Sequence, residues 1–198
     1  RLAHCRKALA FELARHKARL ICVSPSDQFP SGAVLSLERG VELLDIAARQ
    51  GSWILEDDYN SEFHFRDRPL AALRSLDFSG RVIYVGTFSK TLFPSLRLGF
   101  IVCPPGIRED LCRVKRFDDL GSPTVEQAAL AAFMRSRQFE KYLRRTVAEL
   151  EHRRAVFMHS LQRHCGERIA VHEAAEAPAA AVDTPEDLAR VRALWPAA

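Results

Sequence analysis

The segment Gly86-Thr87-Phe88-Ser89-Lys90-Thr91-Leu92-Phe93-Pro94-Ser95-Leu96-Arg97-Leu98-Gly99 joins two apolar runs of the chain. Residues 81–85 before it are rich in β-branched and aromatic side chains, and residues 98–103 after it are mostly apolar, so both runs are predicted to be buried strands. Lys90 therefore lies in a short hydroxyl-rich loop between two strands. Burial there favours the neutral amine over the ammonium ion, which makes Lys90 a candidate Schiff-base nucleophile.

The same loop contains groups of the kind that bind a phosphate. The hydroxyls of Thr87 and Ser89 and the backbone amides of the loop are hydrogen-bond donors, and the guanidinium of Arg97 adds a positive charge. We expect these groups to bind one anion together.

A second motif, Trp53-Ile54-Leu55-Glu56-Asp57-Asp58-Tyr59-Asn60-Ser61-Glu62-Phe63, lies upstream of the lysine loop. Its first five residues form a predicted strand. Because strand side chains alternate, Asp57 and Tyr59 are predicted to project to one side, and Glu56 and Asp58 to the other. An aspartate at the end of a buried strand needs a cationic partner. Taken alone, the acidic run also fits a solvated loop or a metal site.

Together the two motifs resemble the aminotransferase-like domain of the MocR group of GntR-type bacterial regulators, which are relatives of fold-type I pyridoxal-phosphate (PLP) aminotransferases. The resemblance runs from about Arg19 to about Gly166. It implies an α/β fold, namely part of the large domain of a fold-type I PLP-dependent transferase, with a mostly parallel sheet covered by helices. It also implies PLP as the cofactor and a homodimer if the domain is intact.

The resemblance implies a role for each of six residues. These roles are covalent attachment of PLP and proton transfer at Lys90, pairing with the pyridine nitrogen by Asp57, contact with the 3-oxygen by Tyr59, and phosphate binding by Thr87, Ser89 and Arg97. The loop before the second motif has Phe29 where aminotransferases usually have an asparagine before the proline, so no cofactor contact is assigned there. Arg66 and Arg68 are interpreted as solvated loop residues, with clamping of a substrate carboxylate as the alternative.

The order of predicted elements supports a parallel sheet. A strand at 19–23 is followed by a helix at 36–50, which Gly51 ends, and then by the strand at 53–57, which is a right-handed βαβ unit. A helix at 107–117 and a long amphipathic stretch at 125–163 follow the lysine loop, and in the family helices of this region cover the sheet.

Three segments divide the chain. Residues 1–18 are a helical lead that matches no family, and 19–166 form the incomplete PLP-binding domain. Residues 167–198 are an Ala/Pro-rich linker and a capped terminal helix, which is weakly similar to the closing helix of nucleotide-sugar cytidylyltransferases.

Composition restricts the classes of function. The 198 residues are 47% hydrophobic and 27% charged, as in water-soluble globular proteins, so a cytoplasmic protein that does not bind membranes is predicted. The net charge of +4 is small and spread along helices, which gives little support for direct DNA binding. The five cysteines are widely spaced and predicted to be reduced, and the histidines lack the spacing of a metal site.

Three functions are compatible with these features. The first is the effector-sensing, PLP-binding part of a MocR-type regulator, which binds a small molecule with an amino group and contacts DNA only through a domain outside these residues. The second is a PLP-dependent aminotransferase that carries out transamination. The third is a truncated fragment that retains the motifs but has no function.

Overall fold

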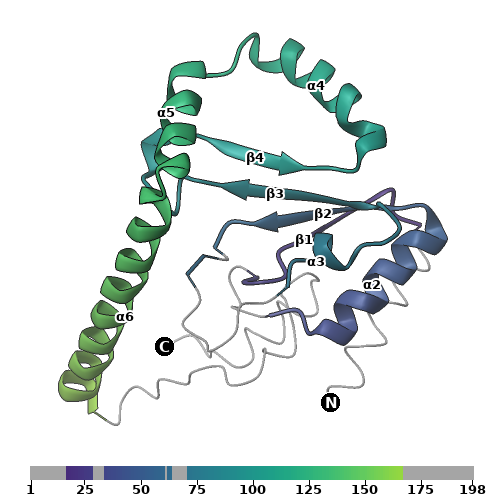
Figure 1. Ribbon diagram of the computed structural model, residues 1–198. Coiled ribbons are helices and arrows are strands. Elements are labelled where there is room, and N and C mark those ends of the chain that lie inside the picture. Colours follow the sequence, from purple (N-terminus) through teal and green to yellow (C-terminus); the bar gives the residue numbers. More distant parts are fainter. Residues whose placement is uncertain (1–16, 29–33, 61, 64–70, 167–198) are drawn as a thin grey trace, which may run out of the picture.

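The computed structural model describes residues 17–28, 34–60, 62–63 and 71–166 (Figure 1). The described elements are, in chain order, β1 (Leu20–Val23), α2 (Leu37–Gln50), β2 (Trp53–Asp58), α3 (Leu73–Leu76), β3 (Val82–Thr87), the 3-10 turn η1 (Pro94–Leu96), β4 (Gly99–Val102), α4 (Pro105–Asp119), α5 (Thr124–Arg135) and α6 (Gln138–Cys165). The strands and helices predicted between residues 19 and 119 are confirmed to within a few residues. Most of the predicted lead, the tail after Gly166, and residues Phe29, Arg66 and Arg68 lie outside the described residues.

The four strands form one sheet in the order β1-β2-β3-β4 (Figure 1). The first three strands are parallel, and β4 runs antiparallel to β3. The predicted mostly parallel α/β sheet is confirmed. Because β1, β2 and β3 point the same way, their carboxyl ends meet at one edge of the sheet, where ligands bind in open α/β sheets.

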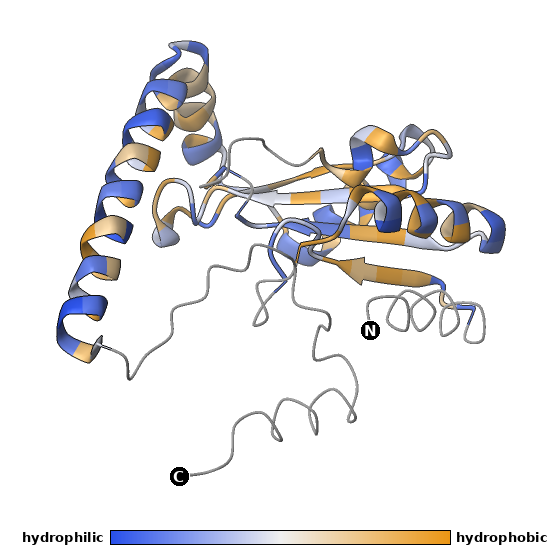
Figure 2. Cartoon of the chain, turned by 90° about the horizontal axis from the view of Figure 1, so that it is seen from below, coloured by the Kyte–Doolittle hydropathy of each residue, from blue (hydrophilic) through white to orange (hydrophobic). Residues whose placement is uncertain are grey.

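Helices α2 and α3 pack on one face of this sheet and form the core with it. Helix α2 begins where the Ser36 hydroxyl accepts a hydrogen bond from the Arg39 amide, and it ends at Gly51, whose φ of 72° lies in the left-handed region. Figure 2 shows apolar residues concentrated in the strands. The core consists of Ile21, Leu43, Leu44, Ala47, Ile54, Leu73 and Val82. Full burial of each large aliphatic side chain contributes roughly 1.5–3 kcal/mol.

The later elements are much more exposed than the sequence predicts. All residues of β4 are exposed, and neither α4 nor α6 has a buried residue, so the prediction of a second buried strand is wrong. The reason is that β4 is an edge strand, pairing only with β3 among the described residues. Figure 1 shows α6 standing at the carboxyl end of β3, so within the described chain the cover of the sheet comes from α2 and α3.

The amphipathic stretch at 125–163 is divided into two helices. Helix α5 ends at Arg135 and α6 starts at Gln138, because Arg137 between them adopts the left-handed conformation with a φ of 58°. No glycine or proline marks this break in the sequence. Within the described residues, none of the helices combines the length and apolarity that crossing a bilayer requires.

Candidate functional site

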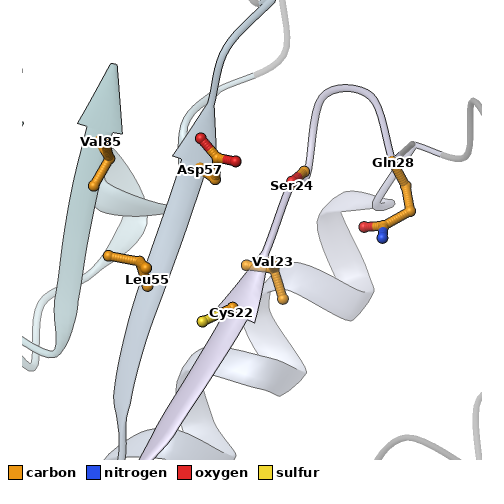
Figure 3. A pocket seen from close by; sticks show the side chains of 7 residues that line it. All are labelled: Cys22, Val23, Ser24, Gln28, Leu55, Asp57 and Val85. Carbon is orange, nitrogen blue, oxygen red and sulfur yellow. The ribbon is translucent and has the colours of Figure 1, made fainter. Parts of the chain in front are cut away.

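A pocket of about 290 Å³ lies at the carboxyl edge of the sheet, on the side away from the core. It is lined by Cys22, Val23, Ser24, Gln28, Leu55, Asp57 and Val85 (Figure 3). Asp57, near the end of β2, lies between Val85 of β3 and Ser24, which follows β1. Its carboxylate is exposed and has no hydrogen bond or ion pair with the described residues. The pocket therefore offers an unpaired negative charge beside the apolar side chains of Leu55 and Val85.

The alternation predicted for the second motif is confirmed, but the burial of Asp57 is not. Glu56 and Asp58 point to the core side and are buried, whereas Asp57 is exposed. The argument that a buried Asp57 requires a cation is therefore wrong for this chain. The physical reason is that α2 and α3 cover only the other face of the sheet.

The segment after β1 is tied to the end of β2 by three hydrogen bonds. Ser26 Oγ donates to Asp58 Oδ1 at 3.0 Å, the Tyr59 hydroxyl donates to the Asp27 carbonyl at 2.5 Å, and Asn60 Nδ2 donates to Asp27 Oδ2 at 3.0 Å. These bonds fix the chain on the two sides of the pocket relative to each other.

Tyr59 lies beside the pocket without lining it. Its hydroxyl proton is directed to Asp27, so only its oxygen lone pairs remain for a ligand. Burial raises the pKa of Tyr59, and the negative charges of Asp27 and Asp57 raise it further. The hydroxyl is therefore a neutral group close to the Asp57 carboxylate.

Lys90 lies in the loop between β3 and β4, and it is exposed. The prediction that this lysine is desolvated is wrong, because its side chain is exposed and the neighbouring strand β4 is exposed as well. The Lys90 amine has no hydrogen bond or ion pair with the described residues. Since β2 and β3 are parallel neighbours, with Asp57 opposite Val85, the loop begins at the same sheet edge as Asp57.

Of the predicted phosphate-binding residues, Ser89 and Arg97 lie in the same loop as Lys90, and Thr87 is the last residue of β3 before it. Thr87 Oγ1 accepts from the Ser89 amide at 3.1 Å and contacts the Leu98 carbonyl at 3.4 Å. Arg97 is exposed and adopts the left-handed conformation with a φ of 51°. Of the six predicted residues, Asp57 alone lines the described pocket. Tyr59 follows β2, and the other four lie between the end of β3 and the start of β4.

Two carboxylates that the sequence left without a role are structural. Glu56 accepts hydrogen bonds from the amides of Leu73 at 2.7 Å and Arg74 at 2.8 Å, so it joins β2 to the start of α3. Burial raises the pKa of Glu56, the two amide hydrogen bonds oppose this, and nearby Asp58 adds to it. Asp58 accepts from the Tyr84 hydroxyl at 2.7 Å. Alternation placed both on the core side, but nothing in the sequence indicated their partners. Among the described residues no group of His, Cys, Asp and Glu is arranged to hold a metal ion.

Two known proteins with similar sequences are regulators by name. The protein named "Probable rhizopine catabolism regulatory protein MocR" of Rhizobium meliloti is 45% identical over 80% of this chain and 32% of its own length. The HTH-type transcriptional regulator YhdI of Bacillus subtilis is 36% identical over 81% of this chain and 34% of its own length. The chain thus spans about a third of the length of these relatives.

A solved structure with a similar fold is an enzyme. LysN, an α-aminoadipate aminotransferase from Thermus thermophilus, superimposes with a TM-score of 0.72 and 30% identity over 79% of this chain and 41% of its own. The family model for aminotransferase class I and II matches residues 10–191, which includes the sheet, the pocket and the Lys90 loop. With nearly the whole sequence matched and the mostly parallel sheet in place, this chain belongs to the aminotransferase class I and II family.

Proposed function

We propose that this chain is the PLP-binding, effector-sensing part of a MocR-type regulator of the GntR family. One observation carries the proposal: the Asp57 carboxylate, which has no partner among the described residues, lies in a pocket at the same sheet edge as the loop that carries Lys90. The similarity to MocR and to an HTH-type regulator supports the regulatory reading. The LysN structure, which contains N-(5'-phosphopyridoxyl)-L-leucine, supports the choice of cofactor.

The groups at this edge fit PLP in charge and shape. The free carboxylate of Asp57 suits a protonated ring nitrogen, and Leu55 and Val85 supply apolar contacts for an aromatic ring. The pocket volume of about 290 Å³ is just below the range for small-molecule sites, which is roughly 300–1,000 Å³. The exposed Lys90 amine has no hydrogen bond or ion pair with the described residues that would have to break before it reacts with PLP.

PLP, when bound, supplies an electron sink for bond changes at the carbon that carries an amino group. Lys90 would hold the cofactor through its Nζ, and once an incoming amino group takes its place on the cofactor, the released Lys90 amine would accept and return a proton. Asp57 keeps the ring nitrogen protonated by ion pairing. Tyr59 offers its oxygen as an acceptor, or its proton once the bond to Asp27 is released. Phosphate binding falls to Thr87, Ser89 and Arg97, on one loop.

The partners follow from this reading. A small molecule with an amino group is the effector, and a second copy of the protein completes the site as a homodimer. Contact with DNA is made by another domain of a longer cytoplasmic protein. The similarity to full-length regulators about three times as long as the matched segment supports this division.

The test is an absorbance spectrum of the purified chain after incubation with PLP and desalting. We expect a retained absorbance band from PLP attached to the lysine, which borohydride abolishes by fixing the cofactor to the protein. Lys90→Ala abolishes retention, whereas the matched control Lys141→Ala, an exposed lysine on α6, leaves it unchanged. Absence of a retained band in folded wild-type protein contradicts the proposal and favours the reading as a fragment without function.

The similarity to LysN favours an aminotransferase as the second candidate. The two candidates share the site and differ in turnover. Incubation with PLP, an amino donor and a keto acid distinguishes them, because a transaminase accumulates the keto acid of the donor over many turnovers. A regulator stops after at most one equivalent.

A further inference from the structure

We infer that Phe139 and Tyr142, at the start of α6, are positioning residues for the loop that carries Lys90. The inference rests on the proposed function, because the position of the loop matters for the cofactor only if Lys90 binds it. It extends that function because it assigns to α6 the role of setting the position of Lys90.

The first contact is made by Phe88, two residues before Lys90. Its ring packs against Phe100 of β4 at a centroid distance of 5.3 Å and against the edge of Phe139 at 6.1 Å. Phe100 in turn lies over Gly86, where a Cβ would overlap its ring. Phe88 is therefore held between the sheet and α6.

The second contact is on the other side of Lys90. The Tyr142 hydroxyl donates a long hydrogen bond of 3.5 Å to the carbonyl of Leu92. The amide of Leu92 donates to the carbonyl of Phe88 at 2.9 Å, which closes the turn, and Thr91 inside it is buried. Lys90 lies on the outside of a closed turn, and α6 contacts that turn on both sides of the lysine.

Helix α5 fixes the start of α6 in turn. Phe133 contacts Phe139 at 6.2 Å and Tyr142 at 6.4 Å, both with the rings edge to face. Together Phe88, Phe100, Phe133, Phe139 and Tyr142 form what we call the aromatic corner. No residue of α6 is buried, and Tyr142 itself is 36% exposed, so within the described chain the ring contacts of this corner, rather than burial, hold the start of α6. With 28 residues α6 is roughly 40 Å long. A change in the angle of this helix therefore changes the ring contacts in the aromatic corner.

These contacts connect α6 to the turn that carries Lys90, and the effect of α6 on that turn can be measured. Hydrogen exchange of the backbone amides in residues 88–92 is compared among the wild type, Phe139→Leu and Tyr142→Phe. The matched control is Phe157→Leu, which removes a ring that is 61% exposed on the same helix. Loss of one aromatic or hydrogen-bond contact is expected to accelerate exchange roughly two- to tenfold in the first two variants, with no change in the control.

A second readout follows the lysine itself. Each protein is incubated with PLP and reduced with borohydride, and peptide mass spectrometry gives the ratio of label at Lys90 to label at the exposed Lys141. We expect this ratio to fall roughly two- to tenfold in Phe139→Leu and Tyr142→Phe, with labelling done well below the melting temperature of every variant. A purely structural role for the two rings would lower the melting temperature without changing the ratio.

The outcomes separate the two proposals. A wild-type protein that labels Lys90 selectively, with variants that label it equally well and exchange at the wild-type rate, overturns the positioning role and leaves the cofactor site intact. A wild-type protein without selectivity refutes the cofactor site, and hydrogen exchange alone then decides whether α6 holds the turn. If Phe139→Leu fails to fold, Tyr142→Phe, which removes one oxygen atom, gives the result.

Discussion

Substitution of Gly86 by alanine tests the packing on which the lysine loop depends. Gly86 is buried in β3 opposite Phe100, and a Cβ there would overlap the Phe100 ring. Phe100 is 37% exposed, so its ring can move toward solvent, but this movement gives up its contacts with Tyr84 at 5.9 Å and Phe88 at 5.3 Å. Displacing it weakens both aromatic pairs, each contributing about 0.5–1.5 kcal/mol, so Gly86→Ala lowers the free energy of unfolding by roughly 1–3 kcal/mol.

Gly106 provides the control for this change. It lies in α4, and a Cβ added there meets no atom within 4 Å. Because Gly106 is the second residue of the helix, Gly106→Ala meets no overlap and changes the free energy of unfolding by less than about 0.5 kcal/mol. The assay is urea unfolding of the full chain, monitored by circular dichroism. The variants are compared only where the dependence of the free energy of unfolding on urea concentration is the same as in the wild type.

A third variant identifies the cause. In Gly86→Ala combined with Phe100→Ala the overlap disappears, so the double variant loses less than the sum of the two single losses. Equal stability of Gly86→Ala and wild type, or simple additivity in the double variant, refutes the packing of Phe100 on Gly86.

Two further changes test other contacts. Burial raises the pKa of Glu56 above its ordinary value of 4.5, so the folded protein keeps this proton to higher pH than the unfolded chain. Stability therefore falls as pH rises from about 4.5 through the folded pKa, and Glu56→Gln removes this part of the pH dependence in urea unfolding; an unchanged profile contradicts the burial. Ser36→Ala removes the side-chain acceptor for the Arg39 amide and lowers the free energy of unfolding by about 1 kcal/mol, whereas Ser95→Ala on the exposed η1 turn has little effect.

Local patterns in the sequence predict the elements of the sheet well. Ser36 and Gly51 mark the ends of α2 because capping is a matter of a few neighbouring residues. Strand alternation separates Asp57 from Glu56 and Asp58 for the same reason. The projection of these carboxylates to opposite faces of the sheet was therefore predictable from the two-residue alternation of a strand.

Features that depend on distant neighbours were not predictable in this way. The exposure of Lys90 and β4 depends on which elements cover the sheet edge, and an apolar run has the same pattern at an edge as in a centre. The break at Arg137 uses a left-handed arginine, which leaves no signal in composition. The aromatic corner joins residues from β3 to α6, and no spacing rule connects Phe88 to Phe139.

The central claim is that Asp57 and Lys90 belong to one PLP site. The most direct measurement is the dissociation constant of PLP for Asp57→Asn, beside the control Asp45→Asn on the exposed face of α2. Loss of a charged hydrogen bond, about 1.5–3 kcal/mol, predicts that Asp57→Asn raises the dissociation constant of PLP roughly 10- to 150-fold. The free energy of unfolding of Asp57→Asn stays unchanged. The control Asp45→Asn keeps the wild-type dissociation constant. Equal dissociation constants for Asp57→Asn and wild type would contradict the claim.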